Sequence, residues 1–375
     1  MISRLLKEKI LQRMEDEKVL IFFGPRQVGK TTLLKSIQKE IDKSTVWWNG
    51  DEPDIRNQLQ DASSRLLDEF IGNNDLLIID EAQRIENIGL ILKLIKDNIP
   101  DVKVIATGSS SFDLANKINE PLTGRKWEFF LYPLSTEEMI NEHGLLDESR
   151  LLKHRLVYGY YPEVVTSKGQ EAEILNQLAS SYLYKDILTW EQIQKPAKLE
   201  KLVQALAFQV GQQVSINEVA QTAGLDFHTV SRYIDLLEKA YIIFQLQPFS
   251  RNLKNEIKKS RKIYFYDNGI RNAVINQFNG FDLRQDKGAL WENYLMSERK
   301  KFLDYHNQRK LTYFWRNHAQ QEIDYLEEAN AEIEAFEFKW NPNAKAKFSK
   351  SFTNEYQPKV TRIIHQDNYL DFIRS

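Results

Sequence analysis

Short unbroken runs of apolar residues dominate the first third of the chain. Val19–Phe23, residues 76–79 and the start of residues 102–111 each form such a run between polar residues. Runs of this length are typical of parallel strands that are buried on both faces. Helical spacing follows the first run over residues 31–41, and a weaker strand is predicted to end near Asn49. The pattern predicts an α/β domain built on a parallel sheet.

The pattern becomes helical after residue 134 and stays so to about residue 195, just before Pro196. Two helices are then predicted, over residues 217–222 and Phe227–Lys239, with a turn at Gly224 and a strand over residues 242–249. This succession is typical of a helix-turn-helix followed by a wing. We therefore expect a helical lid and then a winged helix.

Alternation with a period of two marks the last third. Residues 262–274 predict a strand, a turn at Asn268–Gly269 and a helix, and further strands are predicted over residues 311–317 and 335–340. A strand near residues 362–365 and a closing helix complete the pattern. The predicted organisation is an α/β core on a parallel sheet (1–133), a helical lid (134–195), a winged helix-turn-helix (196–262) and a second α/β domain (263–375).

Composition restricts the chemistry. The 42% hydrophobic and 28% charged fractions are those of an ordinary soluble globular protein, and the net charge of −2 provides no global attraction to nucleic acid or anionic lipid. The absence of cysteine excludes disulfides and thiolate metal sites, and fits a reducing cytoplasm. No run approaches the roughly 20 apolar residues of a membrane helix. We expect a cytoplasmic protein without a membrane partner.

The segment GPRQVGKTT, between the first strand and the first long helix, matches G-x-x-x-x-G-K-[ST]. Glycines allow the backbone amides to surround a phosphate, and the helix N-terminus adds its positive end. Lys30 would carry charge to the β- and γ-phosphates of ATP, and Thr31 would offer its hydroxyl to Mg²⁺. The predicted nucleotide-binding residues are Gly24, Pro25, Arg26, Gln27, Val28, Gly29, Lys30, Thr31 and Thr32.

Two acids and two hydroxyls end the next strands. Asp80 follows a buried strand and would reach Mg²⁺, while Glu81 would orient the attacking water. Thr107 and Ser109 end another strand, where they would sense the γ-phosphate or simply cap the following helix. Arg125 is the candidate for stabilising the γ-phosphate charge, in cis or in trans; the alternative is a plain surface arginine.

The last third contains an acid, a hairpin connection and an E-x-K pair. Glu337 and Lys339 are two residues apart on one strand and so share a face, while Phe336 and Phe338 share the other. Asp324 lies on the preceding strand, and Glu292 on an upstream helix. These carboxylates would hold a second Mg²⁺, with Lys339 beside it, as in PD-(D/E)-x-K nucleases. A strand with a solvated face is the alternative.

A local basic surface is expected near the winged helix. His228, Thr229 and Arg232 occupy the N-terminal part of its second helix, from which side chains reach DNA bases. The segment from Arg251 to Lys262 is strongly basic and adds Lys258, Lys259 and Arg261. Acids at Asp226, Asp235 and Glu238 oppose DNA, so a protein-binding adaptor is the alternative.

The ordered segments GPRQVGKTTLL, LLIIDEAQRI, VIATGSSS, LTGRKWEFFLYPLS and YGYYPEVV resemble a large prokaryotic family of AAA-type ATPases related to the archaeal ATPases. In that family an ATPase domain precedes a C-terminal domain of unknown function that looks like a PD-(D/E)-x-K fold. The resemblance therefore implies a P-loop ATPase core over residues 1–133 and a restriction-endonuclease-like α/β domain over residues 263–375. The resemblance spans nearly the whole chain and implies ATP binding. This chain departs from it at YGYYPE, where two glycines are more usual, and at Ile323–Asp324, which lacks the proline.

Two functions follow as hypotheses. The first is a slowly hydrolysing ATPase that acts on duplex DNA through its winged helix, with or without cleavage. The second is an ATP-switched signalling or scaffold protein, with a protein partner or a homo-oligomer and an inactive C-terminal domain. DNA-stimulated ATP hydrolysis that fades with salt separates them.

Overall fold

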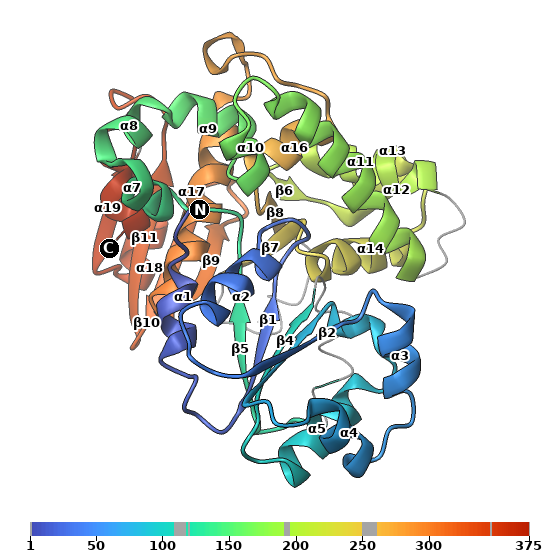
Figure 1. Cartoon of the computed structure of the whole chain (residues 1–375). Helices are drawn as coiled ribbons and strands as arrows, with labels where there is room; N and C mark the ends of the chain where they lie inside the picture. Colours follow the sequence, from blue (N-terminus) through green and yellow to red (C-terminus); the bar gives the residue numbers. More distant parts are fainter. Residues whose placement is uncertain are drawn as a thin grey trace. The chain divides into compact units, whose positions relative to one another are not determined.

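The computed structural model describes residues 2–108, 118, 121–190, 196–249, 261–345 and 347–374, with the side chains of residues 181–190 excepted. The fold is mixed α/β, and the chain divides into two compact units (Figure 1). Unit 1 comprises Met1–Leu134 with Lys239–Tyr241, and unit 2 comprises Ser135–Glu238 with Ile242–Ser375. No helix in the described ranges is long and apolar enough to cross a bilayer.

Unit 1 is built on a five-stranded parallel sheet in the order β2-β3-β4-β1-β5. The strands are β1 (Val19–Phe23), β2 (Thr45–Asn49), β3 (Leu76–Asp80), β4 (Lys103–Gly108) and β5 (Lys126–Phe130). The central strands β1, β3 and β4 are buried along their whole length, as their apolar runs predict. Because all five strands are parallel, their carboxyl ends lie at one edge of the sheet.

Helices connect these strands. They are α1 (Leu6–Leu11), α2 (Lys30–Gln38), α3 (Pro53–Leu59), α4 (Ser64–Ile71), the 3₁₀ turn η1 (Ala82–Arg84) and α5 (Ile88–Asn98). In α2, Leu33, Leu34 and Ile37 are buried at helical spacing, so this helix packs one apolar stripe on the sheet. The helix that begins at the phosphate loop is thereby held by its apolar stripe.

The predicted lid region is helical and lies within unit 2. It contains α7 (Thr136–His143), α8 (Leu145–Arg150), α9 (Leu152–Tyr158), α10 (Pro162–Thr166) and α11 (Glu171–Trp190). Buried polar contacts attach it to α16 (Asn268–Val274) and α17 (Lys287–Tyr305): the Thr136 amide donates to Glu298, and the Tyr160 amide donates to Asp267. At Gly159, φ is +71° and any side chain would overlap the Asp267 carboxylate, so only glycine fits.

Three helices and three strands occupy the predicted winged-helix region: α12 (Pro196–Phe208), α13 (Ile216–Ala223), α14 (Phe227–Lys239), β6 (Gln213–Val214), β7 (Ile243–Pro248) and β8 (Arg261–Phe265). Gly224 ends α13 in the left-handed conformation, which makes the tight turn into α14. The predicted boundary between residues 262 and 263 falls inside β8. The predicted turn at Asn268–Gly269 is wrong, because Asp267 caps α16 and these residues form its first turn.

Unit 2 contains a seven-stranded mixed sheet in the order β12-β11-β10-β9-β7-β8-β6. Its remaining elements are β9 (Leu311–Arg316), β10 (Glu322–Ala329), β11 (Glu332–Phe338), β12 (Val360–Ile364), η2 (Phe281–Leu283), α18 (Lys350–Tyr356) and α19 (Tyr369–Arg374). β7 pairs in parallel with β9, which joins the strands after α14 to the C-terminal hairpin in one sheet.

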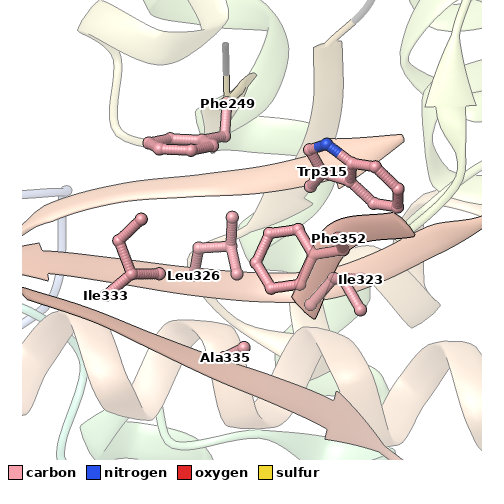
Figure 2. Close-up of a cluster of buried hydrophobic side chains, with 7 residues drawn as sticks. All are labelled: Phe249, Trp315, Ile323, Leu326, Ile333, Ala335 and Phe352. Carbon is pink, nitrogen blue, oxygen red and sulfur yellow. The ribbon is translucent and has the colours of Figure 1, made fainter. Parts of the chain in front are cut away.

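Apolar clusters cover both faces of the hairpin strands. On one face, Phe352 of α18 packs among Phe249 and side chains of β9, β10 and β11 (Figure 2). On the other face, Tyr325, Phe336 and Phe338 surround Phe372 of α19. The sequence pattern placed Phe336 and Phe338 in a core, and they are buried there. A bulge in β10 between Ile323 and Leu326 interrupts the alternation at Asp324.

Candidate functional site

The phosphate loop follows β1 at the carboxyl edge of the unit 1 sheet. Gly24 lies so close to the Leu131 carbonyl that a side chain would overlap it, and Gly29 has φ +93° as the N-cap of α2. Lys30 is buried and donates to the carbonyls of Gly24 (2.9 Å) and Pro25 (2.8 Å). The loop thus curls around its own lysine in a form suited to surround a phosphate.

Arg4 braces this loop from outside the motif, and the sequence analysis did not identify it. Its guanidinium is buried and donates to the carbonyls of Val28 (2.7 Å) and Tyr132 (2.6 Å). These bonds tie the phosphate loop to the segment after β5. No local pattern marks Arg4, because its partners lie 24 and 128 residues away.

The predicted metal and water residues meet beside the loop. The Thr31 hydroxyl donates to Asp80 Oδ2 at 2.6 Å, and the Thr107 hydroxyl donates to Asp80 Oδ1. The Glu81 amide donates to the Thr107 oxygen at 3.2 Å. Two strand ends, those of β3 and β4, and the N-terminus of α2 are therefore linked through the Asp80 carboxylate. A carboxylate and a hydroxyl are oxygen ligands that suit Mg²⁺, so this arrangement fits the predicted metal.

Glu81 has a left-handed backbone, with φ +49°, which turns its side chain away from the line of β3. Gln83 of η1 donates to Glu81 Oε2 at 2.6 Å. Gln83 was not predicted, although its place in DEAQ, two residues after the acid, is visible in the sequence. The amide donor fixes the orientation of this carboxylate.

Arg125 lies at the wrong edge of the sheet to act in cis. It immediately precedes β5, whose Lys126 pairs with Val19 at the start of β1, whereas the phosphate loop follows Phe23 at the end of β1. The strand separates the two positions by roughly 15 Å. Arg125 instead pairs with Asp97 at 2.5 Å and is partly exposed. This placement speaks against the cis alternative, which, like the trans alternative, stays a prediction. Ser109 lies outside the described residues.

In unit 2 the structure brings the predicted nuclease-like residues together. Lys339 Nζ is 2.9 Å from Glu337 Oε2 and 3.4 Å from Asp324 Oδ2, and the Phe338 amide donates to Asp324. These groups belong to what we call the carboxylate–lysine cluster: Lys262, Tyr264, Glu292, Glu322, Asp324, Glu337 and Lys339.

Lys262 is the central cation of this cluster. Its Nζ atom lies 3.1 Å from Glu292 and 2.5 Å from Glu322, with Asp324 at 3.9 Å. The sequence analysis placed Lys262 at the end of an exposed basic segment, and this is wrong because the residue is only 1% exposed. Lys262 and Tyr264 alternate on β8, and this spacing would have indicated a shared inward face.

Burial and like charge shift the titration of the acids. Burial raises the pKa of Glu292 to about 7, although Lys262 opposes the shift. Burial and the Asp324 carboxylate raise the pKa of Glu337 to about 7. Burial lowers the pKa of Lys262, but the charges of Glu292, Asp324 and Glu322 outweigh it, so the pKa lies above its usual value. The cluster therefore keeps its ammonium charged at neutral pH.

The cluster does not have the arrangement of a metal site. Within the described ranges, no three His, Cys, Asp or Glu side chains come together so that they could hold a metal ion. The predicted second Mg²⁺ set of Glu292, Asp324 and Glu337 is divided by Lys262 and Lys339, whose ammonium groups lie among the carboxylates. As it stands, the residue set does not fit a second Mg²⁺.

The predicted DNA-binding residues have four different outcomes. His228 and Arg232 are exposed on α14. Thr229 takes part in the cap of α14, because its amide and its hydroxyl both donate to the Asp226 carboxylate (2.9 and 2.5 Å). Arg261 donates to Gln245 on the neighbouring strand. Lys258 and Lys259 lie outside the described residues.

Comparisons with known proteins agree with the geometry of unit 1. Residues 16–140 match the model of an AAA domain, while residues 149–280 and 287–370 match models of two domains of unknown function (DUF8612 and DUF4143). Two of the relatives that match the chain are named only as uncharacterized proteins. One from Mycobacterium tuberculosis is 27% identical over 329 residues, covering 86% of this chain and 70% of the relative. One from Haemophilus influenzae is 24% identical, covering 77% and 74%.

Among solved structures, a Walker-type ATPase of Pyrococcus abyssi is similar with a TM-score of 0.50 and 14% identity, covering 73% of this chain and 96% of that one. At this identity the likeness concerns the fold. Together with the AAA-domain match, it supports an AAA-type ATPase with a P-loop fold in the N-terminal region, for which nucleotide binding is the expected activity.

Proposed function

We propose that this protein binds ATP with Mg²⁺ and hydrolyses it at the carboxyl edge of the unit 1 sheet. The observation that carries the proposal is the hydrogen-bonded chain from Thr31 through Asp80 and Thr107 to Glu81. It sets a Mg²⁺-compatible oxygen pair and a candidate base beside the phosphate loop. Residues 24–32 form the nucleotide-binding loop in this proposal.

Each side chain has a separate task. Lys30 would exchange its loop carbonyls for the β- and γ-phosphate oxygens. Thr31 and Asp80 would hold Mg²⁺, which neutralises phosphate charge when bound. Glu81 would accept a proton from, and orient, the attacking water, with Gln83 fixing its carboxylate. Thr107 would hold Asp80 and the Glu81 amide in register.

The decisive experiment separates binding from turnover. Glu81→Gln keeps the size of the side chain and one acceptor oxygen but removes the base, so we expect ATP to remain bound while hydrolysis stops. The matched control is Glu86→Gln, an exposed acid in the same segment. Filter binding of labelled ATP and phosphate release report the two steps. A Glu81→Gln protein that hydrolyses ATP at the wild-type rate would refute the proposed site.

We expect intrinsic turnover to be slow. An arginine that stabilises the γ-phosphate charge contributes about 10³–10⁵ in rate, and Arg125 lies at the opposite edge of its own sheet. If Arg125 acts at all, it acts on a neighbouring copy. A homo-oligomer or a protein partner would then raise the rate, which an increase in specific activity with protein concentration would report.

A second proposal concerns duplex DNA. The exposed His228 and Arg232 on the N-terminal half of α14 support a winged helix that contacts DNA. ATP hydrolysis with and without random duplex DNA at two salt concentrations tests it. Stimulation that fades with salt and is lost in His228→Ala/Arg232→Glu, but not in the exposed control Arg309→Glu, supports DNA binding.

A rate of ATP hydrolysis that does not respond to DNA would favour the alternative, an ATP-switched scaffold with a protein partner.

The hairpin β10–β11 with Asp324, Glu337 and Lys339 supports a PD-(D/E)-x-K-like fold for residues 263–375. Whether that fold cleaves DNA is tested by comparing nicking of plasmid DNA by the wild type and Asp324→Ala. Equal nicking by both would remove cleavage from the proposal.

A further inference from the structure

We infer that the ammonium group of Lys262 is the permanent cation of the carboxylate–lysine cluster, and that this cluster takes no divalent metal. The inference is independent of ATP hydrolysis, because every residue involved belongs to unit 2. The sequence pattern predicts a metal-dependent site in the C-terminal sheet. We assign to the same place a cluster of carboxylates that pair with lysine side chains of the chain itself.

The position of Lys262 carries the argument. A divalent ion held by Glu292 and Asp324 would have to lie between their oxygen atoms, and the Lys262 Nζ atom lies there, 3.1 Å from one and 3.9 Å from the other. Glu322 adds a third carboxylate at 2.5 Å. One ammonium group therefore contacts three carboxylates, as a bound cation would.

Lys262 is held in this position. Its side chain is 1% exposed, and the ammonium group also lies 5.7 Å from the centre of the Phe314 ring. β8 is flanked by β6 and β7, so the backbone of Lys262 is fixed on both sides. Moving the ammonium away would leave three buried or half-buried carboxylates without their cation, which is costly. A metal would have to displace this buried charge.

The acids are also committed to further donors. Glu292 accepts from the Tyr264 hydroxyl at 2.7 Å, and Glu322 lies 3.4 Å from Arg316. Asp324 lies between Lys262 and Lys339. Four carboxylates therefore face three cations, and each acid has at least one partner. Pairing of every acid within the chain is typical of a structural ion cluster, whereas a metal site needs carboxylates that have no such partner.

A metal ion from solvent can reach the cluster, so restricted access is not the reason that we expect none to bind. An open pocket of about 590 Å³ lies beside the cluster and is lined by Gly211, Gln213, Ser215, Glu218, Arg316 and Glu322, among others. An ion from solvent can therefore reach Glu322. Removing the ammonium should for this reason convert the cluster into a metal site, which provides the test.

The experiment counts Mn²⁺ bound by the full-length, nucleotide-free protein, using the electron paramagnetic resonance signal of free Mn²⁺. An Asp80→Asn background removes the site in unit 1. We expect this protein to bind no more Mn²⁺ than the same protein with Asp324→Asn added. Mn²⁺ that binds the background protein and is lost on adding Asp324→Asn would overturn the inference.

The converse variant is Lys262→Met in the same background. We expect it to gain about one Mn²⁺ per chain, lost again with Asp324→Asn, and to show a melting temperature that Mn²⁺ raises. The matched control is Lys301→Met, an equally buried lysine whose carboxylate contact is Glu298 on its own helix; it should gain none. A folded Lys262→Met protein that binds no Mn²⁺ would count against the inference. Should Lys262→Met fail to fold, the Asp324→Asn comparison decides alone.

Discussion

The two candidate sites use the same residue types, lysine and acids, and differ in what those residues contact. In unit 1, Lys30 donates to neutral carbonyls and Asp80 accepts from neutral hydroxyls. In unit 2, Lys262 and Lys339 lie directly on carboxylates. Neutral partners orient a charge without cancelling it, so a charged ligand gains the full interaction. Opposite charges cancel one another, so the second arrangement supports structure better than it supports binding.

The predicted lid region is bonded to the rest of unit 2. Its helices are bonded to α16 and α17 through buried groups, including Asn268 to the Leu156 carbonyl and Asn272 to the Val157 carbonyl. A lid that moved alone would break these bonds, each worth about 1 kcal/mol or more when buried. Any nucleotide-dependent motion of this region would therefore carry the rest of unit 2 with it.

Lys30→Ala should produce the largest effect. Removing the cation that faces the phosphates is expected to lower ATP hydrolysis by more than about 100-fold. Lys35→Ala, on the exposed side of the same helix, is the control. Phosphate release at saturating ATP measures both. Retention of wild-type turnover by Lys30→Ala would show that the loop is not the site.

Thr107→Val should have the next largest effect. It removes the hydroxyl that donates to Asp80 and accepts from the Glu81 amide, while keeping the shape of the side chain. Loss of such an outer partner of a metal ligand is expected to reduce turnover about 10- to 100-fold. Thr107→Ser restores the hydroxyl and should restore activity. Equal activity in the valine and serine variants would contradict the proposed link.

The pH dependence of stability probes unit 2. Glu337 has a pKa near 7 in the folded chain against 4.5 as its ordinary value, so between these values the folded state holds the proton that the unfolded state has lost. Its contribution to the unfolding free energy is therefore present at low pH and is lost as the pH rises through 7, by up to about 3 kcal/mol. Urea unfolding at acidic and slightly alkaline pH should show a smaller loss in Glu337→Gln. The exposed control Glu355→Gln should lose as much unfolding free energy between the two pH values as the wild type does. An equal loss in Glu337→Gln would disprove the raised pKa of Glu337.

Arg125→Ala should have the smallest effect. The residue makes a partly exposed pair with Asp97, and pairs of this kind contribute at most about 1 kcal/mol to stability. Turnover in dilute solution should be unchanged, because the residue lies away from its own phosphate loop. A loss of activity that appears only at high protein concentration would support action in trans, and a loss in dilute solution would restore the cis alternative.

Local patterns were sufficient for most of the elements and for the phosphate-loop motif, although the turn predicted at Asn268–Gly269 is the start of α16. β1 spans the predicted Val19–Phe23, and α14 spans the predicted Phe227–Lys239. Spacing along one segment determines these features, and that spacing is visible in the sequence. The contacts of Arg4 were not predictable in the same way, because a partner 128 residues away leaves no trace in local order.

The sequence by itself determined the parallel sheet, the phosphate loop with Lys30 and Thr31, and the strand-end acids Asp80 and Glu81, because apolar runs and motif spacing encode them directly. Only the tertiary structure decided that Arg125 lies at the edge opposite the loop and that Lys262 is buried among carboxylates. Strand direction and sheet order set those distances, and both depend on pairings between segments far apart in the chain. A charge in sequence has no partner until the fold supplies one, and the partner decides whether it binds a ligand or holds the structure.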